Sequence, residues 1–244
     1  MLDSHCHLDD ARFTDLPAVE ARRQAAGVRV LVPAVHPDGW ATLRSLAGRH
    51  GWMFALGTHP ERLDGLADPL PHDLLGAVAI GECGLHRPSA VPMARQIEVL
   101  CGHLAIARDA RLPVILHCVR AHDELPRVLR HFGCPIRGVL HSYGGGPELV
   151  PVYEALGLHL SFGGAITWRG ARKPLEALRR VSADRLLLES DGPDQRPWFE
   201  HDTWGPQSEP AMVPALLHAA AASRRTGRDE LERQLEQNAR ALGW

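Results

Sequence analysis

Two histidines near the start of the chain are spaced so that their side chains could share one metal ion. The sequence begins Met-Leu-Asp-Ser-His-Cys-His, so that a single residue separates His5 from His7. If residues 2–7 form a short strand, alternation places both imidazoles and Asp3 on one face. Neutral imidazole is the commonest side-chain metal ligand in proteins. An isolated pair of this kind is also typical of a surface turn, so the rest of the chain must distinguish the two.

Further ionisable residues stand at the ends of apolar segments. Short apolar segments typical of strands occur at residues 2–7, 28–35, 52–60, 77–84, 112–118, 137–143, 158–164 and 184–193. The residues at or near their carboxyl ends include His5, His7, His59, Glu82, His117, His141 and Asp191. Taken singly, each fits a structural role, such as a hydrogen-bonded core histidine or a capping acid. Their regular recurrence at strand ends instead favours one shared metal site.

Segments with helical periodicity separate these expected strands. They are clearest at residues 93–112, 121–132, 147–156 and 173–181, and two closing helices are expected at residues 209–225 and 229–242. Alternating strands and helices predict parallel pairing, and eight such units predict a closed (β/α)8 TIM barrel in the α/β class. No stretch is typical of an interdomain linker, so we expect residues 1–244 to form a single domain. Strand carboxyl ends open onto one face of such a barrel, where the candidate residues would converge.

The composition limits the kinds of protein that this chain can be. It is 45% hydrophobic and 23% charged, with a formal net charge of −2, so no global positive field draws it to nucleic acid. Its 15 histidines, against 4 methionines and 2 tyrosines, raise the expectation of metal or proton chemistry. Five cysteines without Cys-x-x-Cys spacing are typical of reduced thiols, which predicts a cytoplasmic protein. No export signal or membrane span is expected, and protein partners are not predicted.

The candidate residues define a type of chemistry. Four histidines and two carboxylates would form a mixed nitrogen and oxygen site that suits Zn²⁺ or Mn²⁺, or Mg²⁺ where waters complete the shell. Six ligand groups exceed the needs of one tetrahedral ion, whereas two ions ~3.5–4 Å apart, bridged by a carboxylate, would use them. The expected reaction is therefore metal-assisted hydrolysis. The six residues are His5, His7, Glu82, His117, His141 and Asp191.

Six motifs follow one another along the chain. They are Asp-Ser-His-Cys-His-Leu, Gly-Thr-His-Pro, Gly-Glu-Cys-Gly-Leu, Val-Ile-Leu-His-Cys, a histidine and glycines at residues 141–146, and Glu-Ser-Asp-Gly-Pro. In this order they resemble the TatD family of metal-dependent hydrolases, often described as deoxyribonucleases. The resemblance extends from Asp3 to the late Gln-Asn-Ala-Arg-Ala-Leu segment. It implies a barrel with two or three divalent ions that hydrolyses phosphodiester bonds of DNA, as in a 3'-5' exonuclease acting on single strands or ends.

The same resemblance implies roles for individual residues. His5, His7 and Asp191 would hold one ion, His117 and His141 the other, and Glu82 would bridge the two. Asp191 and Glu82 would be the catalytic residues, because a carboxylate beside a metal-bound water is suited to general base work. For His59, a contact with a substrate phosphate or a further ion is balanced by the alternative of a loop histidine with no partner.

Several positions depart from the family pattern. His86 stands where members commonly have an acid, and Val119 stands where they commonly have arginine, with Arg120 directly after it. His59, His86 and Arg120 are therefore the candidate substrate-binding residues. The segment after Asp191 carries few cations, which predicts weaker binding to long DNA than in a basic relative. This segment contains three aromatic residues that could stack a nucleobase or anchor the loop, of which anchoring is the favoured role: Trp198, Phe199 and Trp204.

Two further hypotheses remain open. The same metal centre could hydrolyse a small amide, lactone or phosphate ester, because fold alone does not separate these activities. Alternatively, the protein could bind metal and act through a partner with little turnover. The three cysteines next to candidate ligands, Cys6, Cys83 and Cys118, are expected to face away from the site and to pack.

Overall fold

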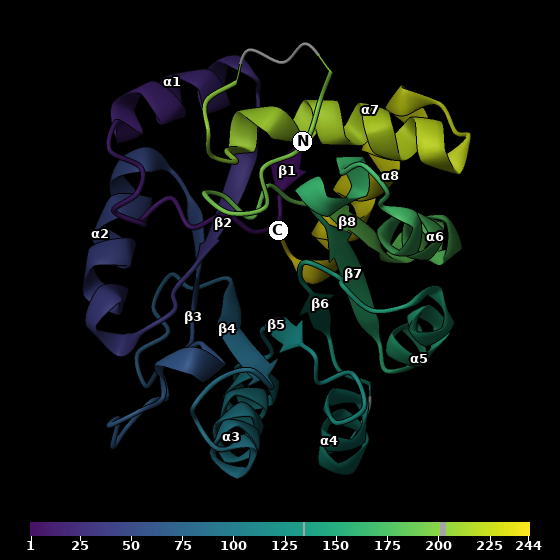
Figure 1. Cartoon of the computed structure of the whole chain (residues 1–244). Coiled ribbons are helices and arrows are strands. Elements are labelled where there is room, and N and C mark those ends of the chain that lie inside the picture. The colour runs from purple at the N-terminus through teal and green to yellow at the C-terminus, as the bar shows by residue number, and fades with distance from the viewer. Residues whose placement is uncertain (134, 201–203) are drawn as a thin grey trace.

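Eight parallel strands form the centre of the fold, as the sequence predicted. The computed structural model describes residues 1–133, 135–200 and 204–244. The strands are β1 (Leu2–Asp3), β2 (Arg29–Pro33), β3 (Met53–Leu56), β4 (Ala79–His86), β5 (Val114–Val119), β6 (Gly138–Leu140), β7 (Leu158–Phe162) and β8 (Leu186–Leu188). They pair in sequence order from β1 to β8, and every pair is parallel. Figure 1 shows the strands at the centre with helices around them.

Backbone hydrogen bonds bring the last strand back to the first. The amide of Ser4 donates to the carbonyl of Leu188 at 3.2 Å, and the amide of Asp191 donates to the carbonyl of His5 at 2.9 Å. These bonds join the chain after β1 to the end of β8 and to the residues that follow it. The two segments that carry the first and last candidate ligands are therefore held side by side, as a (β/α)8 barrel requires.

The helices connect and cover the strands. They are α1 (Leu16–Ala25), α2 (Trp40–His50), α3 (Met93–Ala110), α4 (Leu125–Phe132), α5 (Val150–Ala155), α6 (Arg172–Arg180), α7 (Val213–Arg224) and α8 (Arg228–Leu242). Six of them lie within one to four residues of the expected boundaries, whereas α1 and α2 were not among the segments singled out. None of the helices in the described ranges is long and apolar enough to cross a membrane.

Two boundaries differ from the expectation in ways that matter for the site. The first strand ends at Asp3 rather than His7, because the following residues bond alternately to β2 and to the chain after β8. Strand β4 extends to His86, beyond the expected end at residue 84, because its last residues pair with β5. Glu82 therefore lies within β4 rather than at its end.

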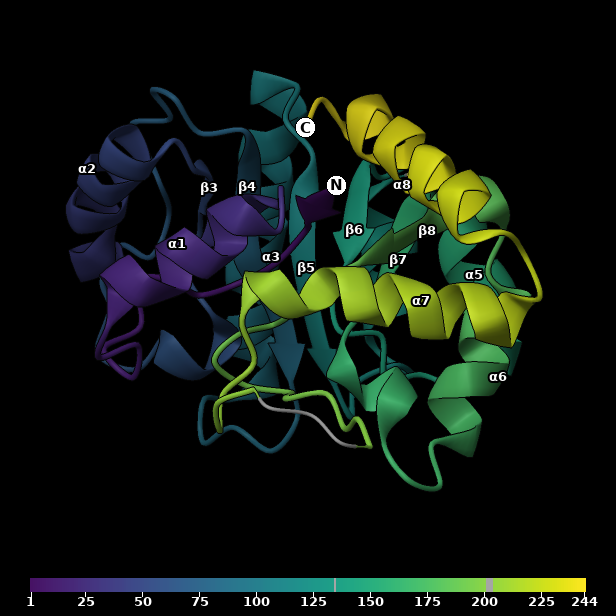
Figure 2. The ribbon, with the colours of Figure 1, turned by 90° about the horizontal axis from the view of Figure 1, so that it is seen from above.

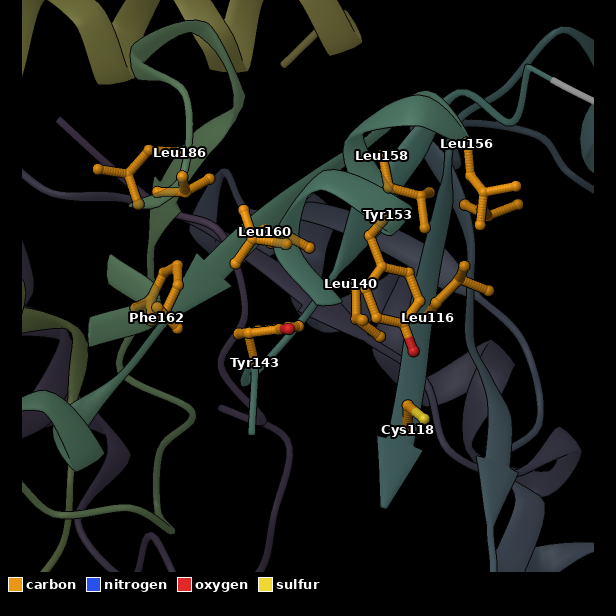
Figure 3. Close-up of a cluster of buried hydrophobic side chains, with 14 of the residues drawn as sticks. Leu116, Cys118, Leu140, Tyr143, Tyr153, Leu156, Leu158, Leu160, Phe162 and Leu186 are labelled. Atoms are coloured by element: carbon orange, nitrogen blue, oxygen red, sulfur yellow. The ribbon is translucent and has the colours of Figure 1, made fainter. Parts of the chain in front are cut away.

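The hydrophobic core lies in two layers. Inside the barrel, Leu31, Ile115 and Leu187 pack near Trp244, which follows α8 and belongs to the same buried cluster. This cluster includes Leu2 and Trp244, near the two ends of the chain. Figure 2 shows both chain termini at the same end of the barrel. A larger cluster lies between the strands and the surrounding helices, and Figure 3 shows part of it, including Leu140, Leu160 and Phe162. The opposite end of the barrel is left for polar residues.

Close contact between β4 and β5 positions two of the candidate ligands. Gly84 pairs with His117 across these strands and has φ +149°, a conformation that residues with a side chain rarely adopt. A Cβ atom at Gly84 would overlap the backbone carbonyl oxygen of His117. The absence of a side chain therefore allows the approach that brings β4 and β5 together beside Glu82.

We expect Gly84→Ala to lower the free energy of unfolding by at least about 2 kcal/mol, because the overlap forces backbone movement. Denaturant titration would measure the change. The control is Gly48→Ala on the exposed face of α2, where no atom lies within 4 Å of the added Cβ. That replacement should stabilise the protein by about 0.5–1 kcal/mol through helix propensity. Equal stability of Gly84→Ala and the parent protein would contradict the packing argument.

Candidate metal centre

The six residues expected to bind metal meet at the polar end of the barrel around one buried carboxylate. Glu82 is 2% exposed, and its two oxygens face different imidazoles. Oε2 lies 3.3 Å from His5 Nε2 and 3.4 Å from His7 Nε2. Oε1 lies 2.8 Å from both His117 Nδ1 and His141 Nε2. Glu82 thus stands between two pairs of histidines, which is the arrangement expected of a carboxylate shared by two ions.

Within each pair, the imidazole nitrogens are close enough to share a ligand. Nε2 of His5 lies 3.1 Å from Nε2 of His7, and Nδ1 of His117 lies 3.1 Å from Nε2 of His141. The first pair is close despite the early end of β1, because backbone bonds hold this segment extended. The pairs predicted from the sequence are therefore brought together.

Asp191 lies on the side of the first pair. Its Oδ1 is 3.6 Å from His5 Nε2 and 4.0 Å from His7 Nε2. Its Oδ2 accepts a hydrogen bond of 2.7 Å from the Gln195 side-chain amide, which also contacts the Ser142 hydroxyl. Burial raises the pKa of Asp191 to about 7, although the nearby His141 opposes this shift. Gln195 thus holds the carboxylate through Oδ2, and Asp191 gains or loses its proton near neutral pH.

The charges of the metal-free histidines differ according to their surroundings. Burial lowers the pKa of His5 to about 4. Burial also opposes protonation of His7, but Glu82, Asp191 and Asp9 outweigh it and raise the pKa of that imidazole to about 9. The pKa of His141 lies well above its usual range because Glu82 and Glu189 overcome the cost of burial. In the metal-free protein at neutral pH, His7 and His141 therefore carry protons beside Glu82.

Of the three candidate substrate-binding residues, two lie beside the metal ligands. His59 Nε2 is 3.5 Å from Glu82 Oε1, and its Nδ1 accepts a hydrogen bond from the Glu61 amide. The alternative of a loop histidine with no partner is therefore wrong. His86 Nδ1 lies 2.9 Å from His117 Nε2, on the side of that ring opposite Glu82. The ligand atoms of His59, His86 and His117 all lie within 4.8 Å of one another.

Arg120 occupies a different place. It lines a second cavity, together with Ser142 and Gln195, and does not line the cavity that contains the metal ligands. Its carbonyl oxygen accepts a hydrogen bond from Arg87 Nε at 2.6 Å. The structure therefore separates Arg120 from His59 and His86, with which it was grouped.

Several supporting residues were not identified from the sequence. Glu189 is fully buried, lies 3.5 Å from His141 Nδ1 and accepts a 2.6 Å hydrogen bond from the Ser142 amide. Asp3, which was expected to share a face with His5 and His7, instead accepts hydrogen bonds from the Ser190 amide and hydroxyl. The only sequence signal for Glu189 was its place in the Glu-Ser-Asp-Gly-Pro motif, where Asp191 was the obvious ligand.

The remaining expectations near the site have mixed outcomes. Cys6 and Cys83 direct their thiols to backbone carbonyls of Gly192 and Ile115, consistent with packing roles. The sulfur of Cys118 lies 3.5 Å from His122 Nδ1, away from the metal ligands.

Phe199 packs against the core, whereas Trp198 is 40% exposed and Arg169 stacks over its ring. The Phe199 side chain thus anchors the loop, whereas Trp198 and Trp204 are held through their backbones, by bonds to Thr167 and Arg196. Cys134 lies outside the described residues.

The donor set fits divalent metal ions. Oε2 of Glu82, Nδ1 of His5 and Nδ1 of His141 are buried and have no hydrogen-bond partner among the residues that the structure describes. An unpaired buried carboxylate oxygen is costly unless a cation or proton satisfies it. Imidazole nitrogens with carboxylate oxygens suit Zn²⁺ or Mn²⁺. These groups could hold ions on either side of Glu82 and still leave the cavity of about 360 Å³ above them open to a substrate.

Comparison with known proteins identifies close relatives. Residues 2–242 match the family model described as TatD related DNase. The chain is 31% identical to an uncharacterised metal-dependent hydrolase, YjjV of Escherichia coli, covering 99% of this chain and 96% of that protein. It is also 31% identical to the 3'-5' ssDNA/RNA exonuclease TatD of Edwardsiella piscicida, covering 99% and 98%. The crystal structure of the Escherichia coli YjjV protein superposes with a TM-score of 0.87 at 30% identity, covering 99% of this chain and 97% of that chain.

We expect metal binding at pH 7 to release roughly two to three protons per chain, because His7 and His141 are protonated in the metal-free protein, Asp191 is partly protonated, and the ions must displace those protons. Affinity should consequently rise with pH towards about 9, where His7 loses its proton unaided. Calorimetry in two buffers with different ionisation enthalpies would count the protons. His7→Asn should release about one proton fewer, and uptake of Zn²⁺ without proton release would show that these histidines are neutral or are not ligands.

Proposed function

The chain belongs to the TatD family of metal-dependent hydrolases, and from this premise we propose that it is a phosphodiesterase that removes nucleotides from the ends of single-stranded DNA. The observation that carries the proposal is the position of the Glu82 carboxylate between two pairs of imidazoles. A two-ion centre of this kind is suited to displacement at phosphorus, where both the attacking and the leaving oxygen need charge stabilisation.

We propose that two divalent ions bind, with Zn²⁺, Mn²⁺ and Mg²⁺ as candidates. His5, His7 and Asp191 would hold one, His117 and His141 the other, and Glu82 would contact both. When bound, the ions would supply Lewis-acid polarisation of the phosphoryl group and acidify water. A third ion could bind among His59, His86 and His117, and would then share His117 with the second ion.

Asp191 is the proposed proton acceptor for the attacking water. Gln195 holds its Oδ2, so that Oδ1 remains directed towards His5 and the centre of the site. Its pKa of about 7 in the metal-free protein shows that burial has raised its affinity for a proton. His59 is partly buried and lines the same cavity, where it is placed to contact a phosphate oxygen. The carboxylate and this imidazole both line the cavity, where they would orient water and substrate.

The surroundings of the site support action at ends rather than within long strands. The cavity over the metal ligands is also lined by acids that are not among the proposed ligands, namely Asp9, Asp10, Glu61 and Asp194. A continuous polyanion crossing this side would meet like charges at short range, where salt screens them least. A chain end exposes fewer phosphates to those acids. The relative from Edwardsiella piscicida is named for exonuclease activity on single strands, which agrees with this proposal.

We also propose that the protein works in the cytoplasm. The cysteines in the described part of the chain, Cys6, Cys83, Cys101 and Cys118, are free thiols. Unpaired cysteines are usual in reducing compartments. This supports the proposal without bearing on the chemistry of the site.

A paired assay tests the proposed activity. Protein stripped of metal and then restored with Zn²⁺, Mn²⁺ or Mg²⁺ should bind about two ions and shorten an end-labelled single strand faster than a matched duplex, because only the single strand presents free bases and a flexible end. Electrophoresis of the products distinguishes loss from the ends from internal cleavage. An intact strand together with turnover of a small amide, lactone or phosphate ester would instead establish the alternative hydrolase activity at the same centre.

Isosteric replacement tests the two carboxylates separately. Glu82→Gln and Asp191→Asn should each lower kcat by about 10³-fold or more, because bridging charge and proton acceptance are lost while shape is kept. Glu82→Gln should also reduce the bound metal, measured by elemental analysis. Thermal unfolding should remain cooperative in both variants, and Glu176→Gln on the exposed face of α6 serves as the control. Normal turnover by Glu82→Gln would remove the bridging role.

A further inference from the structure

A second cavity opens at the same end of the barrel, next to the metal centre. It has a volume of about 440 Å³ and lies over the carboxyl ends of β5, β6 and β7, between the loops that follow them. Gln195 and Ser142 line this cavity, and the Gln195 amide also donates to Asp191 Oδ2. The cavity therefore begins one side chain away from the proposed proton acceptor. Its size is within the range of small-molecule sites, ~300–1,000 Å³.

The charge of this cavity is opposite to that of its neighbour. Arg120 and Lys173 both line it, and no aspartate or glutamate is found in its lining among the residues that the structure describes. Neither side chain forms a salt bridge within the described ranges, so no described carboxylate lies within ion-pair distance of either charge. In the cavity over the metal ligands, by contrast, Arg12 is paired with both Asp10 and Asp194 at 2.8 Å. Arg62 also lines the metal cavity, but acids outnumber the arginines there, so a second anionic group of a bound substrate is attracted more strongly to the side of Arg120 and Lys173.

The cavity also presents aromatic surface. Trp168 is 45% exposed, although its indole N–H donates to the carbonyl of Arg196 at 2.9 Å and so fixes the ring. Deeper in the cavity lie Tyr143 and Phe162, which Figure 3 shows on neighbouring segments of the barrel wall. An exposed but oriented indole is suited to stack on a planar base, since every nucleobase offers a π-face. Cations beside an aromatic platform together match a nucleotide better than either a simple anion or an apolar ligand.

We propose that this second cavity is a nucleotide subsite, which binds the nucleotide next to the scissile phosphate with its base against Trp168 and its own phosphate against Arg120 and Lys173. This inference rests on the proposed phosphodiesterase function, and it gives the substrate a direction across the mouth. The strand extends from the metal centre over the cationic cavity. The acidic side accommodates a terminal nucleoside, which has no further phosphate to repel.

Charge reversal tests the electrostatic part of the proposal. The metal-loaded protein is assayed with a dinucleotide containing one phosphate, a trinucleotide containing two, and the base-free diester bis(p-nitrophenyl) phosphate. Arg120→Glu and Lys173→Glu should raise KM for the trinucleotide about tenfold with little change in kcat, and should leave turnover of the base-free diester within about twofold. Arg180→Glu, at the exposed far end of α6, is the matched control and should resemble the parent protein.

Replacement of the indole tests the stacking part. Trp168→Ala should raise KM for both nucleotide substrates by about tenfold, and Trp168→Phe should restore much of the loss because a ring face remains. Equilibrium dialysis of deoxyadenosine monophosphate against the metal-loaded protein gives a second readout that needs no turnover. Its affinity should fall in Trp168→Ala and in Lys173→Glu but not in Arg180→Glu.

The outcomes separate this inference from the function on which it rests. If the base-free diester is hydrolysed but the Arg120, Lys173 and Trp168 variants leave both KM and monophosphate binding unchanged, the subsite is wrong and the phosphodiesterase activity stands. If no phosphodiester is hydrolysed, the proposed function fails. Monophosphate binding that depends on Trp168 and Lys173 would then still establish the nucleotide subsite, and binding independent of them would refute it.

Discussion

Glu82 carries a negative charge that is almost completely removed from solvent, and the end of the barrel is organised around neutralising it. Its pKa lies well below the usual range because His141, His5 and His59 together outweigh the cost of burial. Such a charge is tolerated only where partners surround it. The barrel supplies them from separate strands, since parallel strands all end on the same side. The same geometry that surrounds the carboxylate with imidazoles also places nitrogen ligands on both of its sides.

A buried framework keeps these partners in position. Glu189 lies behind His141, and Asp3 receives the amide and hydroxyl of Ser190, so that the chain on either side of Asp191 is fixed by hydrogen bonds. Residues that hold the outer nitrogen of a ligating imidazole set its orientation and basicity. At the other end of the barrel, the cluster around Trp244 is apolar. Stability and chemistry are therefore separated along the barrel axis, which allows polar residues to gather at one end without weakening the core.

The sequence predicted the barrel, and the residues expected to bind metal lie close together in the structure, because each follows or lies within a recognisable apolar strand. The extent of β4 was less predictable, since its pairing with β5 continues through Gly84, where a glycine usually suggests the end of a strand. The contact between Glu189 and His141 was not predicted, because strand alternation does not show that a residue close in sequence to a ligand also faces the site. The second cavity depends on Gln195 and Trp168, which approach each other only when loops far apart in the sequence have folded. Local patterns contain no information on that approach.

His86 illustrates how a departure from the family pattern can keep the local charge. An acid at this position would place a negative charge directly beside His117, whereas His86 places a neutral or cationic ring there, with Nδ1 2.9 Å from His117 Nε2. The other nitrogen of His86 lies 3.5 Å from Glu61 Oε1, so a carboxylate is still present, one ring further from His117. The His86 amide is held by Gln96 at 2.7 Å, which fixes the backbone at this point. Because electrostatic influence falls with distance, His117 would be polarised less strongly than by a directly bound acid. Glu61 also lines the metal cavity, so its carboxylate contributes to the negative charge on the side that the proposed substrate strand avoids.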